Sequence, residues 1–539
     1  MTTATERTAG VDASPPAKPA PAWPLAALAG GVALVVVLAP YLMAPGDYRA
    51  AALPLVERAQ ELLDVGPRRA LAGPELPLPV LVTSVGEALV GDPVDPLRAP
   101  ALGGALALAA AAALTVLAAG QVAGLFAAAA AALLFILCPG VLYHARTLGP
   151  EASHVLAASL LLHAALLARG PRSAEGGPLA GGAGPLEPHS PARRNLALAL
   201  LGGLALAASA LSTWYGVFLF LAWPVMVVLA RPVEPLRGEP ATGHSGTWRL
   251  PPVPLAAFAA LALGAALLLA WPHLATETGK RLLALLHDPM RLPHPPTLAA
   301  GHIYDQAVGA APPFLVGLVA VVVRFPAVLC LLAAIGLRAP AGRPAAVAAG
   351  AHALVLALNG GPGHLGLDAA LALLPFLVFL AALGAARVAS HRVARVAALV
   401  ACLSPVVGLI RTAPVEPAFR SELLLGRAAS SWDTLPAGTL PSPVVEWMGQ
   451  SLPQGARVAF EPDAAAGPLR ELFDALVRRG VLRRDLGSAA PYHATHGVFV
   501  RRPGGTPPAQ APLSPGGPPA EPLFRLELGG IPELVVAPY

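Results

Sequence analysis

The chain has 539 residues and a formal net charge of +5, with 55% hydrophobic and 12% charged residues. A soluble domain carries about twice that charged fraction. The apolar residues come in continuous blocks of roughly 20, the length that a helix needs to cross a bilayer, and not in the alternating pattern of barrel strands. The sequence therefore excludes a soluble globular protein and a membrane barrel, and it predicts a bundle of membrane-spanning helices.

The chain begins with residues 1–23, which are rich in Ala, Thr and Pro and predict a disordered cytoplasmic tail. The block that follows, 25–43, indicates a first anchor and not a cleaved signal peptide. Further blocks fall near 101–119, 123–142, 153–168, 195–212, 214–230, 254–272, 317–337, 344–358, 367–386 and 396–411. We therefore expect an all-α polytopic membrane bundle of about eleven transmembrane helices over 24–411.

Arginines in the short loops set the expected orientation of this bundle. They are Arg169, Arg172, Arg193, Arg194, Arg231, Arg237, Arg249, Arg338, Arg343, Arg387, Arg392 and Arg395. The positive-inside rule places these loops and the N-terminus in the cytoplasm. An odd number of spans then places the C-terminus outside. The charge is dispersed and forms no basic motif, so we expect no nucleic acid partner.

Three segments on the outer side are too long to be simple connections. The loop 44–98 is predicted to hold helices at 48–65 and 78–90, and the loop 273–316 is rich in His and Pro. The tail 412–539 is predicted to form a small extracytoplasmic α/β domain, with a Pro/Gly linker over 502–521. Its expected helices are 443–452 and 468–479, and its expected strands are 457–460, 497–500, 524–528 and 533–536.

Several short motifs follow one another along the chain in a characteristic order. The first loop carries Gly46-Asp47-Tyr48, Glu57-Arg58, Leu78-Pro79, Gly91-Asp92 and Leu97-Arg98-Ala99-Pro100; later come Cys138-Pro139, Tyr143, Arg146, Glu151, the passage Val323-Arg324-Phe325-Pro326, and the stretch 442–458. This order resembles the glycosyltransferase-C superfamily. Within it, the chain looks like the family 39 branch of dolichyl-phosphate-mannose protein mannosyltransferases and lipid A aminoarabinose transferases. The quotable motifs cover about a third of the chain, and the architecture covers most of it.

The resemblance implies an enzyme that moves a sugar from a polyprenyl-phosphate carrier to an acceptor hydroxyl, with inversion at the anomeric carbon. Asp47 matches the acidic residue that ends the first span, where partial desolvation suits a general base. An alternative role for Asp47 is the N-cap of a helix beginning at Tyr48. Asp47 can serve as a general base and as a helix N-cap at the same time.

Two arginines are expected to bind the carrier phosphate. Arg146 lies in a short outer loop and can hold a phosphate through charge-assisted hydrogen bonds, and Glu151 can orient it or contact the sugar. The alternative is an interfacial ion pair that caps the next helix. Arg324 lies inside an apolar block, where a charge requires a partner or a polar cavity. Its alternative is to snorkel to the outer headgroups.

Other sugar or acceptor contacts are assigned to Tyr48, His294, His302 and Tyr304. The loop 273–316 also holds His273, His287, Asp288 and Asp305, but their spacing matches no metal-ligand template. We therefore expect no metal and no tightly bound cofactor, with the polyprenyl-phosphate sugar as donor substrate. Cys138, Cys330 and Cys402 lie in apolar runs and predict buried free thiols.

The leading hypothesis is thus a multi-pass membrane glycosyltransferase that serves an envelope lipid, glycan or protein acceptor. The high Ala, Pro and Arg content fits a GC-rich bacterium, so the expected location is the inner membrane. An inactive relative whose tail binds a partner is the second hypothesis, because Tyr48 stands where many relatives have a second acid and aromatic residues are scarce. The third is a transporter, although the sequence has no internal repeat.

Overall fold

The computed structural model describes only part of the chain. The described residues are 24, 27–32, 35, 47–67, 77–90, 98–168, 191–212, 216, 218–230, 252–269, 280, 297–299, 302–304, 318–319, 322–358, 367–412, 438–461, 463–500, 522–528 and 531–538. The predicted tail 1–23, the linker 502–521 and His294 lie outside these residues, as does most of the predicted first span.

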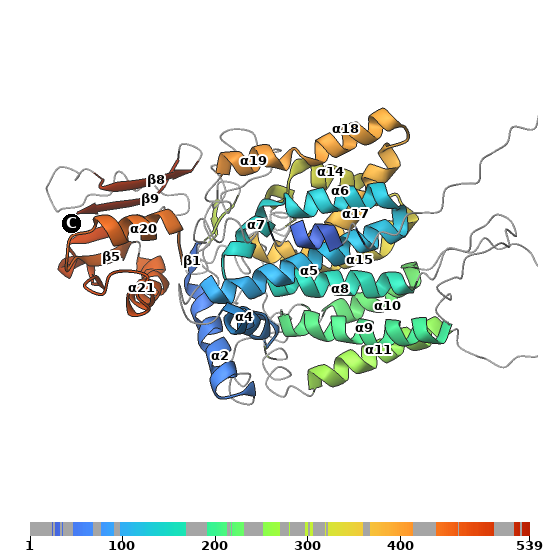
Figure 1. The fold of residues 1–539 in the computed structure, drawn as a ribbon, viewed down its shortest axis with the longest axis horizontal. Coiled ribbons are helices and arrows are strands. Elements are labelled where there is room, and N and C mark those ends of the chain that lie inside the picture. Colours follow the sequence, from blue (N-terminus) through green and yellow to red (C-terminus); the bar gives the residue numbers. More distant parts are fainter. Residues whose placement is uncertain are drawn as a thin grey trace, which may run out of the picture.

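The largest part of the fold is a bundle of helices rich in Ala, Leu and Val (Figure 1). In chain order its helices are α5 (Arg98–Ala123), α6 (Leu125–Ile136), α7 (Pro139–Arg146), α8 (Glu151–Leu167), α9 (Pro191–Ser212), α10 (Phe218–Ala230), α11 (Pro252–Leu269), α14 (Ala327–Gly336), α15 (Arg343–Leu358), α17 (Leu374–Val388), α18 (Arg392–Cys402) and α19 (Pro405–Thr412). The 3-10 segments η4 (Pro340–Gly342) and η5 (Leu367–Leu373) precede α15 and α17.

Four of the described helices are long and apolar enough to cross a membrane: Ala99–Ala123, Ala192–Ser212, Ala370–Val388 and Arg392–Ile410. The number rises to six if each of two bent helix pairs is counted as one span. This is the pattern of a multi-pass membrane protein. The count of about eleven spans and the orientation of the bundle stay predictions.

Prolines interrupt two blocks that the sequence predicts as continuous spans. The block 123–142 is broken before Pro139, where α6 and α7 meet at 56°. The block 317–337 is broken at Pro326, which precedes α14. Proline has no N–H to donate within a helix and restricts the residue before it to extended backbone, so these prolines begin helices and do not continue them.

Glycines set the closest crossing in the bundle, between α14 and α17. A Cβ atom at Gly384 would run into the carbonyl of Leu332, and one at Gly336 would run into the carbonyl of Leu380. The two backbones therefore touch where neither residue has a side chain. Close approach through small residues is how helices gain packing energy in lipid, where the hydrophobic effect does not drive association.

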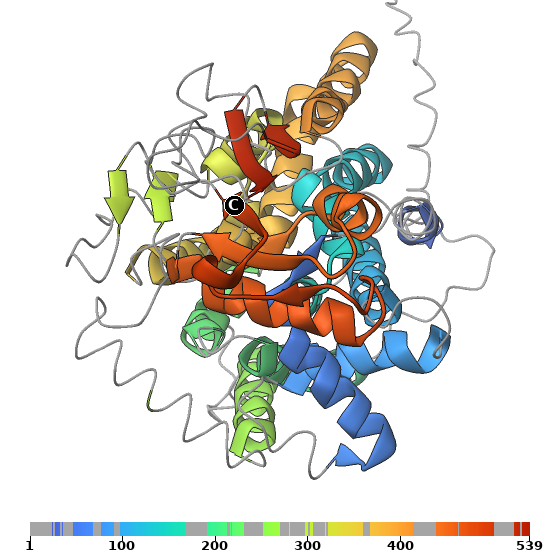
Figure 2. The same ribbon diagram turned by 90° about the vertical axis from the view of Figure 1, so that its left-hand side faces the viewer.

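The C-terminal part is a separate layer made of a five-stranded sheet and two helices. The sheet contains β5 (Arg457–Glu461), β6 (Gly487–Ser488), β7 (His496–Val500), β8 (Phe524–Leu528) and β9 (Ile531–Pro538) in the order β6-β5-β7-β9-β8, and α20 (Ser442–Ser451) and α21 (Asp463–Arg478) pack with it. β5 is parallel to β6 and β7, whereas β9 is antiparallel to β7 and β8. Figure 2 shows this α/β unit in front of one end of the bundle.

The four strands expected in the tail are confirmed with each end within two residues of the prediction, and so is the first helix expected there. The second helix, α21, begins at Asp463, five residues before the expected start at Pro468. The sequence analysis missed β6. It also missed β4 (Thr439–Leu440), whose partner lies far away in the chain.

That partner is β1 (Tyr48–Arg49), in the loop 44–98. The expected helix over 48–65 is therefore wrong at its start, because Tyr48 pairs with Leu440 and Arg49 pairs with Thr439. After the 3-10 turn η1 (Ala50–Ala52), the helix α2 runs over Leu53–Asp64. The second expected helix of this loop is confirmed as α4 (Pro77–Val90).

The β1–β4 ladder joins the first loop to the α/β unit. The amide of Ala50 extends the ladder by donating to the carbonyl of Gly438 over 2.9 Å. Tyr48 and Val56 are buried in the same hydrophobic cluster as Leu440 and Met448. The α/β unit is thus packed against the first loop at the end of the bundle where α7 ends and α8 begins (Figures 1 and 2).

Candidate functional site

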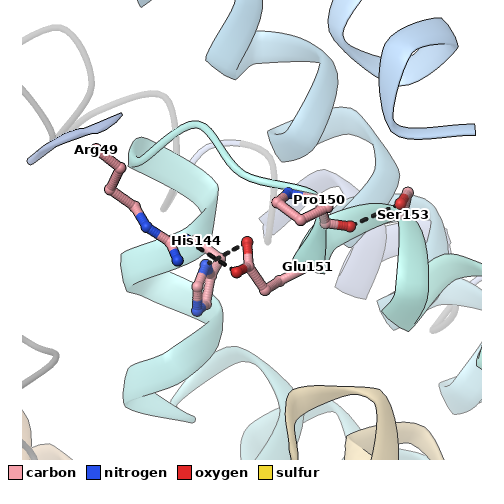
Figure 3. Close-up of polar contacts among 5 residues, drawn as sticks. All are labelled: Arg49, His144, Pro150, Glu151 and Ser153. Atoms are coloured by element: carbon pink, nitrogen blue, oxygen red, sulfur yellow. Dashed lines mark hydrogen bonds and ion pairs between the residues drawn. The ribbon is translucent and has the colours of Figure 1, made fainter. Parts of the chain in front are cut away.

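A buried ion network lies where β1, α7 and α8 meet (Figure 3). Arg49 Nη1 donates to Glu151 Oε1 over 2.9 Å, and His144 Nδ1 lies 3.4 Å from Glu151 Oε2. The Arg49 side chain is 10% exposed, that of Glu151 is 7% exposed and that of His144 is 3% exposed. Buried charges persist in proteins when they are paired and hydrogen-bonded. We call Arg49, His144 and Glu151 the Glu151 network.

The local chain around Glu151 explains how the network fits. Glu151 is the first residue of α8, where a negative side chain is stabilised by the positive end of the helix dipole. Two residues before it, Gly149 leaves space for the network. A Cβ atom at Gly149 would meet the Glu151 carboxylate and would lie 2.7 Å from Arg49 Nη1. Any residue other than glycine at this position would push the two side chains apart.

Asp47 stands at the junction with the α/β unit and is 8% exposed. Its Oδ1 accepts the backbone N–H of Ser442 over 3.0 Å, at the first residue of α20. Asp47 therefore caps α20, a helix that begins almost 400 residues away (|i−j| = 395). It does not cap a helix at Tyr48, because that residue is in β1. The general-base role expected for Asp47 stays a prediction.

Tyr48, between Asp47 and Arg49, is 7% exposed and packs in the cluster shared with the α/β unit. It is thus surrounded by protein at the base of the site. Whether it contacts a sugar stays a prediction.

Arg146 ends α7 and is half-buried, with its Nε donating to the carbonyl of Leu142 over 3.4 Å. Cations at a helix C-terminus interact favourably with the helix dipole. The next residue, Thr147, is 2% exposed. Its Oγ1 finds no hydrogen-bond partner among the residues that the structure describes. Arg146 and Thr147 thus closely follow His144 of the Glu151 network in the chain, and an arginine and a hydroxyl can both donate to phosphate oxygens.

Arg324 is half-buried and directly precedes the break at Phe325 and Pro326. The expectation that it lies within a continuous span is therefore wrong, because α14 begins only at Ala327.

The remaining predicted contacts come from the loop 273–316. His302 and Tyr304 lie in β3 (His302–Tyr304), which pairs with β2 (Thr297–Ala299) in antiparallel register. His294 lies outside the described residues. Among the residues that the structure describes, no group of three or more His, Cys, Asp or Glu could hold a metal ion. The three cysteines are free thiols, with Cys138 and Cys402 buried and Cys330 half-buried.

Sequence reasoning missed Arg49, His144 and Thr147. Arg49 and His144 both lie close in the chain to residues that the motifs single out. Arg49 follows Asp47 by two residues, and His144 precedes Arg146 by two residues in a motif that the sequence analysis had already singled out. Nothing in the local sequence distinguishes Arg49 from the other arginines of the first loop, because its partner Glu151 is about 100 residues away (|i−j| = 102).

No protein-family model and no curated protein matches the chain. Two solved structures of ArnT from Cupriavidus metallidurans resemble it. The one described as bound to undecaprenyl phosphate is 15% identical with a TM-score of 0.44, and the apo state is 16% identical with a TM-score of 0.47. Each likeness covers 95% of this chain and 97% of the other. ArnT is a lipid A aminoarabinose transferase, of the branch that the motifs resemble. No activity of this chain follows from a likeness at this level.

Proposed function

We propose that this chain is a membrane glycosyltransferase that uses a polyprenyl-phosphate-linked sugar and acts at the end of the bundle covered by the α/β unit. The acceptor would be a hydroxyl of an envelope lipid, glycan or protein on the extracytoplasmic side. The observation that carries the proposal is the Glu151 network. A buried acid, arginine and histidine meet at the end of the bundle covered by the α/β unit. Close to them in the chain are Asp47, Arg146 and Thr147, whose hydroxyl has no hydrogen-bond partner among the described residues.

The proposed reaction is a single displacement. The acceptor oxygen attacks the anomeric carbon, the bond from that carbon to the phosphate oxygen breaks, and polyprenyl phosphate leaves with the electron pair. Asp47 takes the acceptor proton, and inversion at the anomeric carbon follows from attack opposite the leaving group. Arg146 and Arg324 would stabilise the charge on the departing phosphate. The Glu151 network positions β1, and with it Asp47, against α7 and α8.

A donor of this kind matches the undecaprenyl phosphate described in one of the ArnT structures. The residues of the site and the apolar helices of the bundle support the proposal independently of that match. Burying ionisable groups in a membrane protein is costly, so a buried cluster of them is the expected mark of a functional site.

The test separates the two roles of Asp47 by using two variants. In Asp47→Asn the side-chain oxygen can still accept the Ser442 N–H, because Asn caps helices about as well as Asp. That variant loses the base and keeps the cap. In Asp47→Ala both are lost. We expect Asp47→Asn to lower sugar transfer about 100-fold or more, the range for loss of a general base, with unchanged thermal stability. Asp47→Ala should also lose about 1 kcal/mol of stability.

The assay is transfer of radiolabelled sugar from a polyprenyl-phosphate donor in membranes, with envelope extract as acceptor. Asp64→Asn is the matched control, because Asp64 is an exposed acid at the end of α2 in the same loop. Full transfer by Asp47→Asn would remove Asp47 from the mechanism. The second candidate function, an inactive relative, instead predicts no transfer by the wild-type protein either, with the Asp47–Ser442 hydrogen bond purely structural.

A further inference from the structure

Five arginines gather at the end of the bundle opposite the α/β unit. Arg338 and Arg343 flank the turn between α14 and α15, and Arg387, Arg392 and Arg395 flank the turn between α17 and α18. All five side chains are exposed. The α17–α18 turn lies at the right-hand end of the bundle in Figure 1, away from α20 and α21. We call these five residues the arginine patch.

The two turns are held together by the fold. The crossing at Gly336 and Gly384 brings α14 and α17 into backbone contact just before each turn. Arg387 Nη1 then donates to the carbonyl of Arg338 over 3.3 Å, which bridges one turn to the other. The arginines of both turns therefore form one surface.

Within the described parts of 322–412, no acidic residue lies beside the patch. The acid in this stretch is Asp368, in η5, which precedes α17 and so lies toward its other end. The hydrogen bonds that arginines of the patch make go to backbone carbonyls, from Arg387 to Arg338 and from Arg395 to Ala389. Positive charge thus accumulates here without a described carboxylate to balance it.

Helix ends add to this positive charge. Arg343 is the first residue of α15, and Arg392 and Arg395 are in the first turn of α18. The N-terminus of a helix carries a partial positive charge, so cations there are unfavourable. The N-cap residue of α18, His391, also makes no side-chain capping hydrogen bond. An anion at this position would offset the unfavourable placement of cations at the helix N-termini, and it would take the place of the missing side-chain cap on α18.

The surface next to the patch indicates what kind of anion fits. From Arg392, α18 continues with exposed aliphatic side chains at Val393, Val396 and Val400, which are 73%, 63% and 60% exposed. In a membrane-spanning helix such residues face acyl chains. The arginines and these valines therefore form a continuous surface, with cationic groups at the helix end and an apolar strip alongside.

We infer that the arginine patch binds the phosphate headgroup of an anionic membrane phospholipid, with its acyl chains along α18. Basic clusters at the ends of transmembrane helices attract anionic lipids, with each basic side chain near the surface contributing an affinity factor of about fivefold. The inference does not depend on the proposed transferase activity, because the patch is at the other end of the bundle.

The experiment uses the full chain in mild detergent with added phosphatidylglycerol or phosphatidylcholine. Native mass spectrometry counts the retained lipids, and thermal unfolding records the change in Tm. We expect the wild-type protein to retain phosphatidylglycerol preferentially and to gain Tm with it. Arg392→Gln with Arg395→Gln should weaken phosphatidylglycerol retention about 30-fold. The matched control is Arg478→Gln with Arg484→Gln, two exposed arginines of the α/β unit.

A second pair, Arg338→Gln with Arg343→Gln, tests the other turn and should show a similar loss, so the test does not depend on one variant folding. An arm with inorganic phosphate distinguishes a lipid site from a site for free phosphate. Equal retention of the two lipids by the wild-type protein would overturn the inference. So would unchanged phosphatidylglycerol binding in both double variants, or stabilisation by inorganic phosphate equal to that by the lipid.

Discussion

The two ends of the helical bundle differ in how they accommodate charge. Next to the α/β unit, the Glu151 network buries an arginine, a histidine and a glutamate against each other. At the opposite end, the arginine patch exposes five cations with no acid beside them in the described part of the chain. A buried charge requires its partner inside the protein, whereas an exposed charge at a membrane surface can find one in solvent or lipid. The Glu151 network therefore fixes the positions of its own side chains, whereas the arginine patch can take a partner from outside the protein.

The strongest test of this contrast is the variant Glu151→Gln. It leaves Arg49 buried without its anionic partner, which typically costs about 3–5 kcal/mol of folding free energy. Denaturant titration of the purified full chain in detergent measures this loss of folding free energy. Glu446→Gln, at an exposed position of α20, is the control and should change stability by less than about 0.5 kcal/mol.

A double variant sharpens the same comparison. Arg49→Met combined with Glu151→Leu removes both charges and keeps most of the volume, which is often neutral or stabilising. We expect it to recover stability while sugar transfer stays low, since β1 would lose its orienting contact. Recovery of both stability and transfer would mean that the network serves packing alone.

The second prediction concerns the helix crossing that holds the arginine patch together. Gly384→Ala would place a methyl group against the carbonyl of Leu332, and backbone cannot move aside as a side chain can. Overpacking of this kind costs about 2–3 kcal/mol, and we expect a lower Tm together with weaker phosphatidylglycerol retention. Gly350→Ala in α15 is the control, because no atom lies near the added methyl group. A stable Gly384→Ala protein would show that α14 and α17 can separate freely.

The smallest expected effect comes from Gly149→Ala. The added methyl group would meet the ends of two flexible side chains, Arg49 and Glu151, which can swing away. We therefore expect a loss of about 1 kcal/mol, at the low end for overpacking, with a larger relative loss of sugar transfer. Gly467→Ala in α21, where the methyl group meets nothing, should be neutral or slightly stabilising. Equal effects of the two substitutions would argue against a defined Glu151–Arg49 geometry.

The sequence predicted those parts of the fold that local patterns determine. Strands such as β5 and β7 are short, almost continuously buried runs between turn residues, and the apolar helices follow from blocks of Ala, Leu and Val. The start of the first-loop helix was wrong because Tyr48 and Arg49 have strand geometry only through pairing with Leu440 and Thr439. No local pattern reports a partner at that distance.

The residues of the candidate site were largely predictable from the sequence, but the contacts between them were not. Asp47, Arg146 and Glu151 were identified from motifs, and the structure places all three near the end of the bundle covered by the α/β unit. The contacts that these residues make were not predicted. Glu151 contacts Arg49 and His144, and Asp47 contacts Ser442, because burial selects partners from elements distant in sequence. Spacing along the chain had favoured Arg146 as the partner of Glu151.

The ladder between β1 and β4 has a consequence for biosynthesis. Asp47 emerges early in translation, but the Ser442 amide that it binds is made 395 residues later. At about 5–20 residues per second, the first loop waits about 20–80 s for that contact. During this interval the helices can insert one after another, while the surface of the first loop that the α/β unit will cover stays open. A chain cut short before residue 438 would therefore insert into the membrane and still lack a completed site.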